Sequence, residues 1–149
     1  MASLRPKRGN ISPDVKRESA RILLLHSDMR QLSHYRSIFE ELGCTVSATT
    51  SFAEGARWLA PKSFELVLLE QGSKQFEGHS VLAVAMELDS DLRVIVVAEP
   101  YEPKCCFRAL SSGALDYLQA PLTKEQIYEL LDTFVPSVDL CDGTAGSRR

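Results

Sequence analysis

The sequence has no apolar run long enough to cross a membrane. A membrane-spanning helix needs about 20 consecutive apolar residues, and no run in this chain approaches that length. The first 20 residues are basic and polar without an apolar segment, which excludes a secretory signal peptide. The net charge of −3 is too small to favour nucleic acid or membrane surfaces. We therefore expect a cytoplasmic protein that binds neither nucleic acid nor membrane.

The cysteines lack the spacing of a metal site. The four cysteines are Cys44, Cys105, Cys106 and Cys141, with no Cys-x-x-Cys pair and no matching pair of histidines, so we expect no zinc site. Reduced thiols are the simplest interpretation. A redox sensor at Cys105 and Cys106 stays open as an alternative, because thiolates are favoured near a helix start. Adjacent side chains on a helix diverge, which instead favours one packed and one exposed thiol.

Internal repeats and low-complexity segments are also missing. At 149 residues, with 44% hydrophobic and 25% charged residues, the chain is long enough for one domain with a buried core. Residues 1–19 are basic and interrupted by proline and glycine, and residues 137–149 are polar. We predict a disordered tail at each end and a folded domain over residues 20–136.

The clearest strand signal is Leu66-Val67-Leu68-Leu69-Glu70. Four apolar residues end in a carboxylate, and a polar stretch with two glycines follows, up to Gly78. Such a run predicts a strand that is buried on both faces of a sheet. Other apolar or alternating stretches, some of them shorter, predict four more strands, at residues 21–25, 44–50, 93–97 and 114–118.

Helical patterns fill the intervals between these strands. They cover residues 29–42, 51–60, 79–88, 104–112 and 123–134, with Ser27 or Asp28 as the first N-cap and Thr123 opening a capping box with Gln126. The first helix has a stripe that we expect to face inward, at Met29, Leu32, Tyr35, Ile38, Phe39 and Leu42. The last helix has a similar stripe, at Ile127, Leu130, Leu131 and Phe134.

The alternation of five strands with five helices predicts an α/β fold. Short connections favour right-handed crossovers, hence a doubly wound, five-stranded parallel sheet with helices on both faces. Ligands of such sheets bind just outside the carboxyl ends of the strands. Glu70 therefore stands where a site is expected.

Two segments carry a family resemblance. They are Leu66 to Gly78 and the sequence Gly113-Ala114-Leu115-Asp116-Tyr117-Leu118-Gln119-Ala120-Pro121. With them, residues 20–136 resemble the receiver domain of two-component response regulators. The resemblance implies a flavodoxin-like (βα)5 fold with strand order 2-1-3-4-5, and a place in phosphorelay signal transduction.

All five functional positions of that family differ here. The resemblance places His26 and Ser27, with Asp28 one position later, where two acidic residues help to hold magnesium. It places Glu70 at the aspartate that accepts the phosphoryl group. Ala98 stands for the threonine or serine of the fourth strand, and Ala120 for the lysine before the proline. These departures predict a degenerate pseudo-receiver.

The chemistry of the residues supports that interpretation. Magnesium needs carboxylate ligands in strict octahedral geometry, and phosphoryl transfer depends on charge neutralisation, which Ala120 cannot supply. Glu70 would also carry its oxygen one methylene too far out. We expect a non-enzymatic module with no metal and no cofactor. Two alternatives stay open, namely an atypical phosphoreceiver that retains magnesium, and a flavin-type site, although residues 26–32 have no glycine to cradle phosphate.

Several of these residues allow two interpretations. Glu70 is either a phosphomimetic charge or a solvated carboxylate at a strand end. His26 is either a metal-binding or pH-sensitive group or, more simply, a partly exposed loop histidine. We interpret Asp28 as a helix cap rather than as a metal ligand. Tyr117 matches an aromatic residue that moves between exposed and buried positions in working receivers. The alternative is that the Tyr117 side chain is simply packed in the fold.

The resemblance also implies an interaction face around the fourth helix, the fifth strand and the fifth helix. The candidate residues on it are Lys104, Arg108, Tyr117, Gln119, Glu125 and Tyr128. The expected partner is a histidine kinase, a regulator or another signalling protein, or a second copy of the chain. The chain ends soon after the last helix, so we expect any output to pass through that partner.

Overall fold

The structure is a computed structural model that describes residues 20–60 and 64–135. The predicted tails, residues 1–19 and 137–149, lie outside the described residues, as does Cys141. In the part that is described, no helix is long and apolar enough to cross a membrane.

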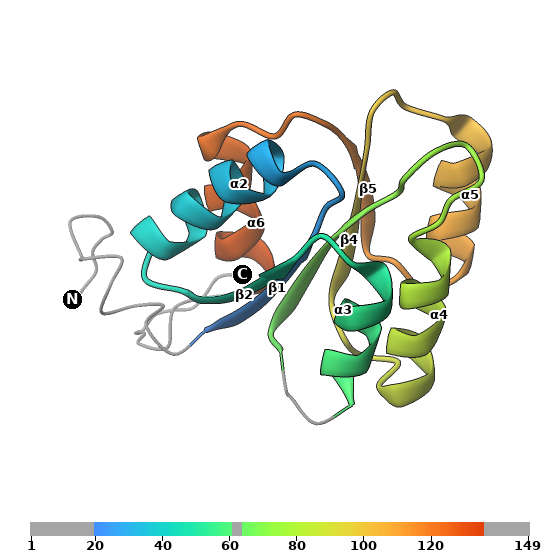
Figure 1. The fold of residues 1–149 in the computed structure, drawn as a ribbon, viewed down its shortest axis with the longest axis horizontal. Helices are drawn as coiled ribbons and strands as arrows, with labels where there is room; N and C mark the ends of the chain where they lie inside the picture. Colours follow the sequence, from blue (N-terminus) through green and yellow to red (C-terminus); the bar gives the residue numbers. More distant parts are fainter. Residues whose placement is uncertain (1–19, 61–63, 136–149) are drawn as a thin grey trace.

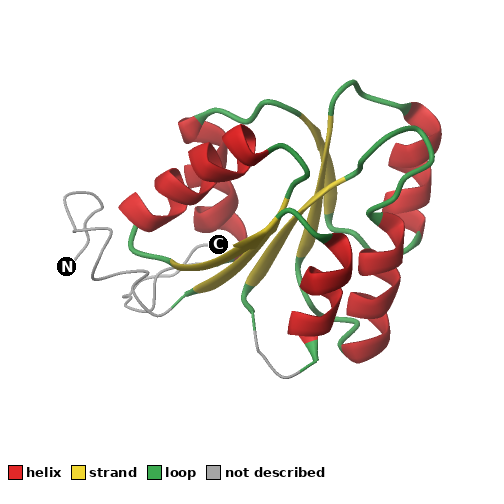
Figure 2. Ribbon diagram, viewed as in Figure 1, coloured by secondary structure: helices red, strands yellow, loops and turns green. Residues whose placement is uncertain are grey.

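Five parallel strands form one sheet in the order β2-β1-β3-β4-β5, which confirms the predicted fold class (Figures 1 and 2). The strands are β1 (Arg21–Leu25), β2 (Thr45–Thr49), β3 (Leu66–Glu70), β4 (Val94–Ala98) and β5 (Asp116–Gln119). The helices are α2 (Met29–Glu41), α3 (Phe52–Leu59), α4 (His79–Leu88), α5 (Pro103–Ser111) and α6 (Lys124–Phe134). Helices α2 and α6 cover one face of the sheet, and α3, α4 and α5 cover the other (Figure 1).

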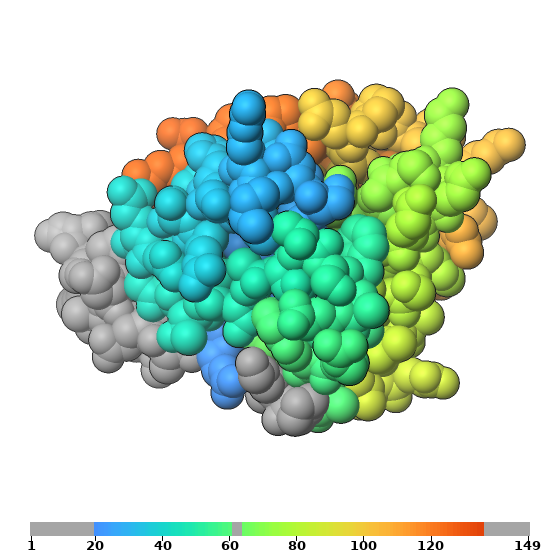
Figure 3. Space-filling view, in the orientation of Figure 1, coloured from blue at the N-terminus to red at the C-terminus, as the bar shows by residue number. Residues whose placement is uncertain are grey.

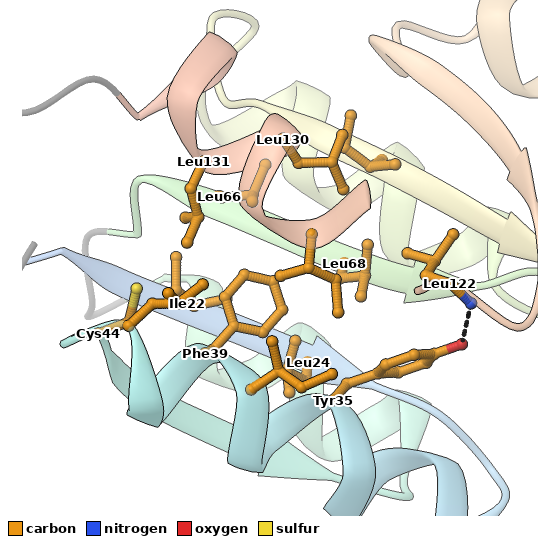
Figure 4. Close-up of a cluster of buried hydrophobic side chains, with 14 of the residues drawn as sticks. Ile22, Leu24, Tyr35, Phe39, Cys44, Leu66, Leu68, Leu122, Leu130 and Leu131 are labelled. Atoms are coloured by element: carbon orange, nitrogen blue, oxygen red, sulfur yellow. Dashed lines mark hydrogen bonds between the residues drawn. The ribbon is translucent and has the colours of Figure 1, made fainter. Parts of the chain in front are cut away.

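The side chains of the central strands alternate between two separate cores. Leu66 and Leu68 of β3 face α2 and α6, whereas Val67 and Leu69 face the three other helices. The central strands β1, β3 and β4 bury both faces, which is why each contains an unbroken apolar run. Figure 4 shows the core under α2, with Phe39 between residues of β1 and the helix α6.

The helix ends follow the predicted capping chemistry. Asp28 caps α2 by accepting a hydrogen bond from the Arg30 amide at 2.9 Å. Ser51 caps α3, and the Thr123 capping box with Gln126 is complete. Each of these side chains satisfies an amide that has no partner inside its helix.

Two local predictions are wrong. Met29 does not face inward but is 62% exposed, because it begins the first turn of α2, before the helix lies over the sheet. The last strand begins at Asp116 and not at residue 114. The reason is that Ala114 still belongs to the end of α5, where its amide donates to the carbonyl of Ala109 at 3.0 Å.

Candidate functional site

Glu70 ends β3 beside the end of β1, at the carboxyl edge of the sheet. Its Oε1 atom accepts a hydrogen bond from the Ser27 amide at 2.7 Å. The side chain is 18% exposed. The Glu70 carboxylate is therefore bound to the β1–α2 loop, and it is neither a freely solvated group nor one that points toward β5.

His26 is buried beside Glu70, so the expectation of a partly exposed loop histidine is wrong. The His26 amide is paired with the carbonyl of Thr49 at 3.3 Å, which fixes the residue beneath the loop. Its Nδ1 atom accepts a hydrogen bond from the Asp28 amide at 3.0 Å. An accepting Nδ1 carries no proton, so the imidazole in this arrangement is the neutral Nε2–H form. The 3.8 Å contact between Nδ1 and Glu70 Oε1 is then not an ion pair.

These acidic groups do not fit a magnesium ion. Glu70 Oε1 already accepts from Ser27, and Asp28 Oδ1 is occupied as the cap of α2. Among residues 20–60 and 64–135, no group of three or more histidine, cysteine, aspartate or glutamate side chains could hold a metal. Magnesium requires several oxygen ligands in near-octahedral geometry, and two carboxylates that each have one oxygen bonded to a backbone amide do not supply enough of them.

The opposite side of the site is apolar. Ala98 and Ala120 are both buried, and the Ala120 amide donates to the Ala98 carbonyl at 2.7 Å. Neither side chain can donate a hydrogen bond or carry a charge. The side chains of Ala98 and Ala120 therefore supply neither a hydrogen-bond donor nor a charge on this side of Glu70.

Tyr35 fills the space next to this apolar side. It projects from α2, is 1% exposed, and its hydroxyl accepts a hydrogen bond from the Leu122 amide at 3.0 Å (Figure 4). Burial raises the pKa of Tyr35, so the hydroxyl stays protonated near neutral pH. The hollow around the site is too small for a water molecule, and is lined by Leu24, Leu25, His26, Leu32, Tyr35, Leu68, Glu70 and Val97. In Figure 3 the surfaces of α2 and α3 lie next to each other.

Gln71 and Tyr117 form a second polar cluster on the other face of the sheet. The Tyr117 hydroxyl donates to Gln71 Oε1 and accepts from the Glu102 amide at 3.1 Å. Tyr117 is 6% exposed, so its expected place on an exposed interaction face is wrong. Burial raises the pKa of Tyr117. This side chain packs because its hydroxyl has two internal partners, which repay the cost of removing it from water.

The other predicted interaction residues do lie on the surface. Lys104, Arg108, Gln119, Glu125 and Tyr128 are all exposed. Arg108 is also held toward α4, since its guanidinium lies 5.6 Å from the centre of the Phe76 ring and 3.4 Å from His79 Nδ1. Sequence reasoning missed two exposed apolar residues of α5, namely Phe107 at 75% and Leu110 at 46%. The available signal was their position on the helix, off the face that buries Cys105 and Ala109.

The two adjacent cysteines differ in exposure, as their positions on a helix predicted. Cys105 is 4% exposed, whereas Cys106 is half-buried. Burial, followed by the charge of Glu102, raises the pKa of the Cys105 thiol. A raised pKa lowers the thiolate fraction, which disfavours a redox role for Cys105.

The fold is that of a flavodoxin-like α/β protein, and Glu70 stands at the carboxyl edge of its parallel sheet. The family model of the response regulator receiver domain matches residues 22–132. Because that match covers most of the sequence, the chain belongs to the response regulator receiver domain family. Members of this family are signalling modules of two-component systems.

Individual relatives are distant. The alginate biosynthesis transcriptional regulatory protein AlgB of Pseudomonas aeruginosa is 26% identical over 110 residues, covering 74% of this chain and 24% of AlgB. Transcription factor SKN7 of Candida albicans is 23% identical over 110 residues, covering 74% of this chain and 20% of SKN7. The chain thus spans a quarter or less of these relatives.

A solved structure supports the fold. A CheY-like response regulator receiver domain protein from Methanospirillum hungatei JF-1 superposes with a TM-score of 0.72 at 24% identity. The match covers 76% of this chain and 91% of that one. At this level of identity, the similarity shows that the two proteins share a fold, and it does not show that they share an activity.

Proposed function

We propose that this receiver domain acts without phosphorylation, as a cytoplasmic protein-interaction module in two-component signalling. Its partner would be a histidine kinase, a regulator or another signalling protein, or a second copy of the chain. On this proposal the domain is not an enzyme and needs no metal or cofactor. Its output depends on a surface that is already formed.

One observation carries the proposal, namely the position of the Glu70 carboxylate. It is bonded to the Ser27 amide at 2.7 Å and lies 3.8 Å from a neutral His26, in the place where metal ligands would be needed. A carboxylate that attacks a phosphoryl group needs positioning and neutralisation of the incoming charge. Glu70 has an internal partner instead, and Ala98 and Ala120 provide no neutralising group.

The same geometry argues against Glu70 as a phosphomimetic. A permanent charge changes the structure only if other groups respond to it. The response of a threonine at position 98 or a lysine at position 120 is missing, because both positions hold alanine. We propose that the Glu70 carboxylate has a structural role, in which it fixes the β1–α2 loop above β3.

The second candidate function is an atypical phosphoreceiver that retains magnesium-dependent chemistry. Its single supporting feature is the partly exposed carboxylate of Glu70, at the position of the phosphoacceptor. On that reading, shortening the side chain to aspartate would place the oxygen correctly and restore function.

We expect the substitution Glu70→Asp alone to create no working receiver. The residues of such a site act as a unit, so a single repair recovers little. The measurement is an amide chemical-shift titration of the wild-type and Glu70→Asp proteins with magnesium and beryllofluoride, which mimics a bound phosphoryl group. Neither protein should give a saturating shift at the Ser27 amide with magnesium in the millimolar range.

Glu70→Gln serves as the matched control, because it keeps the size of the side chain and an oxygen for the Ser27 amide. It reports shifts that come from general ionic effects. Saturation in Glu70→Asp but not in Glu70→Gln would favour the phosphoreceiver over the interaction module.

A further inference from the structure

Gln71 lies directly after β3 and is 3% exposed, although its side chain is polar. Its two polar atoms both have internal partners. The Nε2 atom donates to the carbonyl of Ser73 at 3.0 Å, and Oε1 accepts from the hydroxyl of Tyr117. The bond to Ser73 sets the orientation of the amide, because a carbonyl can only accept. The oxygen of Gln71 is therefore aimed at Tyr117.

The Tyr117 hydroxyl joins Gln71 to the loop that precedes α5. It accepts from the Glu102 amide at 3.1 Å, and its oxygen also lies 3.3 Å from the Glu102 carbonyl. Glu102 is in turn the N-cap of α5, where its side chain accepts from the Lys104 amide at 3.3 Å. A continuous set of hydrogen bonds thus runs from the end of β3 to the first turn of α5.

The buried ring of Tyr117 also supports the exposed ring of Tyr101. The two ring centres are 5.4 Å apart and the planes meet at 80°, which is the favourable edge-to-face arrangement. Tyr101 is 48% exposed. If Tyr117 turned outward, this contact and both of its hydrogen-bond partners would be lost together. The position of Tyr117 therefore determines the shape of the loop between β4 and α5.

We infer that Gln71 is a positioning residue that holds Tyr117 buried without any signal from the carboxyl edge of the sheet, and so keeps the surface of α5 in a single form. This inference rests on the proposed phosphorylation-independent function, since it supplies the means by which the surface stays formed. Glu70 and Gln71 are neighbours in sequence but face opposite sides of the sheet. The bond between Gln71 and Tyr117 is thus independent of the Glu70 carboxylate.

The test is the rate at which each tyrosine is nitrated by tetranitromethane, measured by peptide mass spectrometry. In the wild-type protein, the exposed Tyr101 and Tyr128 should react quickly, whereas Tyr35 and Tyr117 should be protected. The variant Gln71→Met has a similar volume but no acceptor oxygen. Loss of one buried hydrogen bond should raise the nitration rate of Tyr117 by about tenfold.

Tyr35 separates a positioning role from a merely structural one. It lies in the other core, so opening of Tyr117 alone should leave Tyr35 protected. Glu70→Gln is the matched control, and should leave both tyrosines protected. Gln71→Asn keeps the amide but is one methylene shorter, and it replaces Gln71→Met if circular dichroism shows that the methionine variant is unfolded.

The inference is overturned if Tyr117 nitrates as fast as Tyr101 in the wild-type protein, or if neither Gln71 variant changes its rate. It is also overturned if Tyr35 and Tyr117 become reactive together, or if Glu70→Gln opens Tyr117 as strongly. No phosphodonor is present in these reactions, so their failure is distinct from a failure of the proposed function, which would show as magnesium-dependent labelling of Glu70.

Discussion

Replacing Phe39 by alanine should lower the free energy of unfolding by about 3–5 kcal/mol. The ring is 0% exposed and belongs to the core that joins α2 to β1, β3 and α6. Its removal leaves a cavity that the closely packed leucines around it cannot collapse to fill (Figure 4). Because small domains have only about 5–15 kcal/mol of stability in total, this loss is large. Urea unfolding followed by circular dichroism measures it.

Phe107→Ala is the matched control, since it makes the same substitution at a residue that is 75% exposed on α5. A surface substitution of this kind should change the free energy of unfolding by about 0.5 kcal/mol or less. Equal losses in the two variants would show that α2 does not pack on the sheet as the structure describes.

The second large effect concerns partner binding. We expect the double variant Phe107→Ala, Tyr128→Ala to weaken binding of the signalling partner, or self-association, by about 30-fold, while the fold is retained. The expectation rests on the role of large aromatic side chains at interfaces, where a central one contributes about 2 kcal/mol or more. Phe107 and Tyr128 are 75% and 42% exposed, so neither is needed for the core. Tyr117 is excluded from this design because it is buried.

Two variants serve as controls in that experiment. Met29→Ala removes an apolar side chain that is 62% exposed on α2, which is not one of the elements of the predicted interaction face. Glu70→Ala removes the carboxylate at the end of β3. Both should bind nearly as the wild type does, in sedimentation velocity for self-association and in quantitative capture from native cells for a heterologous partner. Loss of binding in Glu70→Ala, with binding retained in the surface variant, would favour the phosphomimetic interpretation.

The sheet could be predicted from sequence because its signals are local. Each strand buried on both faces is an unbroken apolar run, and Leu66 to Glu70 begins and ends where the structure places β3. Side-chain caps such as Asp28 and Thr123 are equally local, because they bond to amides two or three residues away. The strand order 2-1-3-4-5 came with the family resemblance, and the hydrogen-bond pairing of the strands confirms it.

The candidate site could be predicted only in part. The identities of Glu70, Ala98 and Ala120 were readable, but the orientation of Glu70 toward Ser27 depends on a contact between residues 43 positions apart. The pair of Gln71 and Tyr117 is separated by 46 positions. Hydrophobic periodicity assigns a residue to one face of its own helix or strand. It does not identify the polar group on the neighbouring element that the residue will contact. The burial of His26 was missed for the same reason.

The most direct test of the central claim is the intact mass of the protein after incubation with acetyl phosphate and magnesium. A receiver that works without phosphorylation should gain no phosphoryl group at Glu70, because Ala120 offers no charge and the carboxylates are committed to the amides of Ser27 and Arg30. We predict identical masses with and without magnesium. Stable labelling that requires magnesium and disappears in Glu70→Gln would contradict the account.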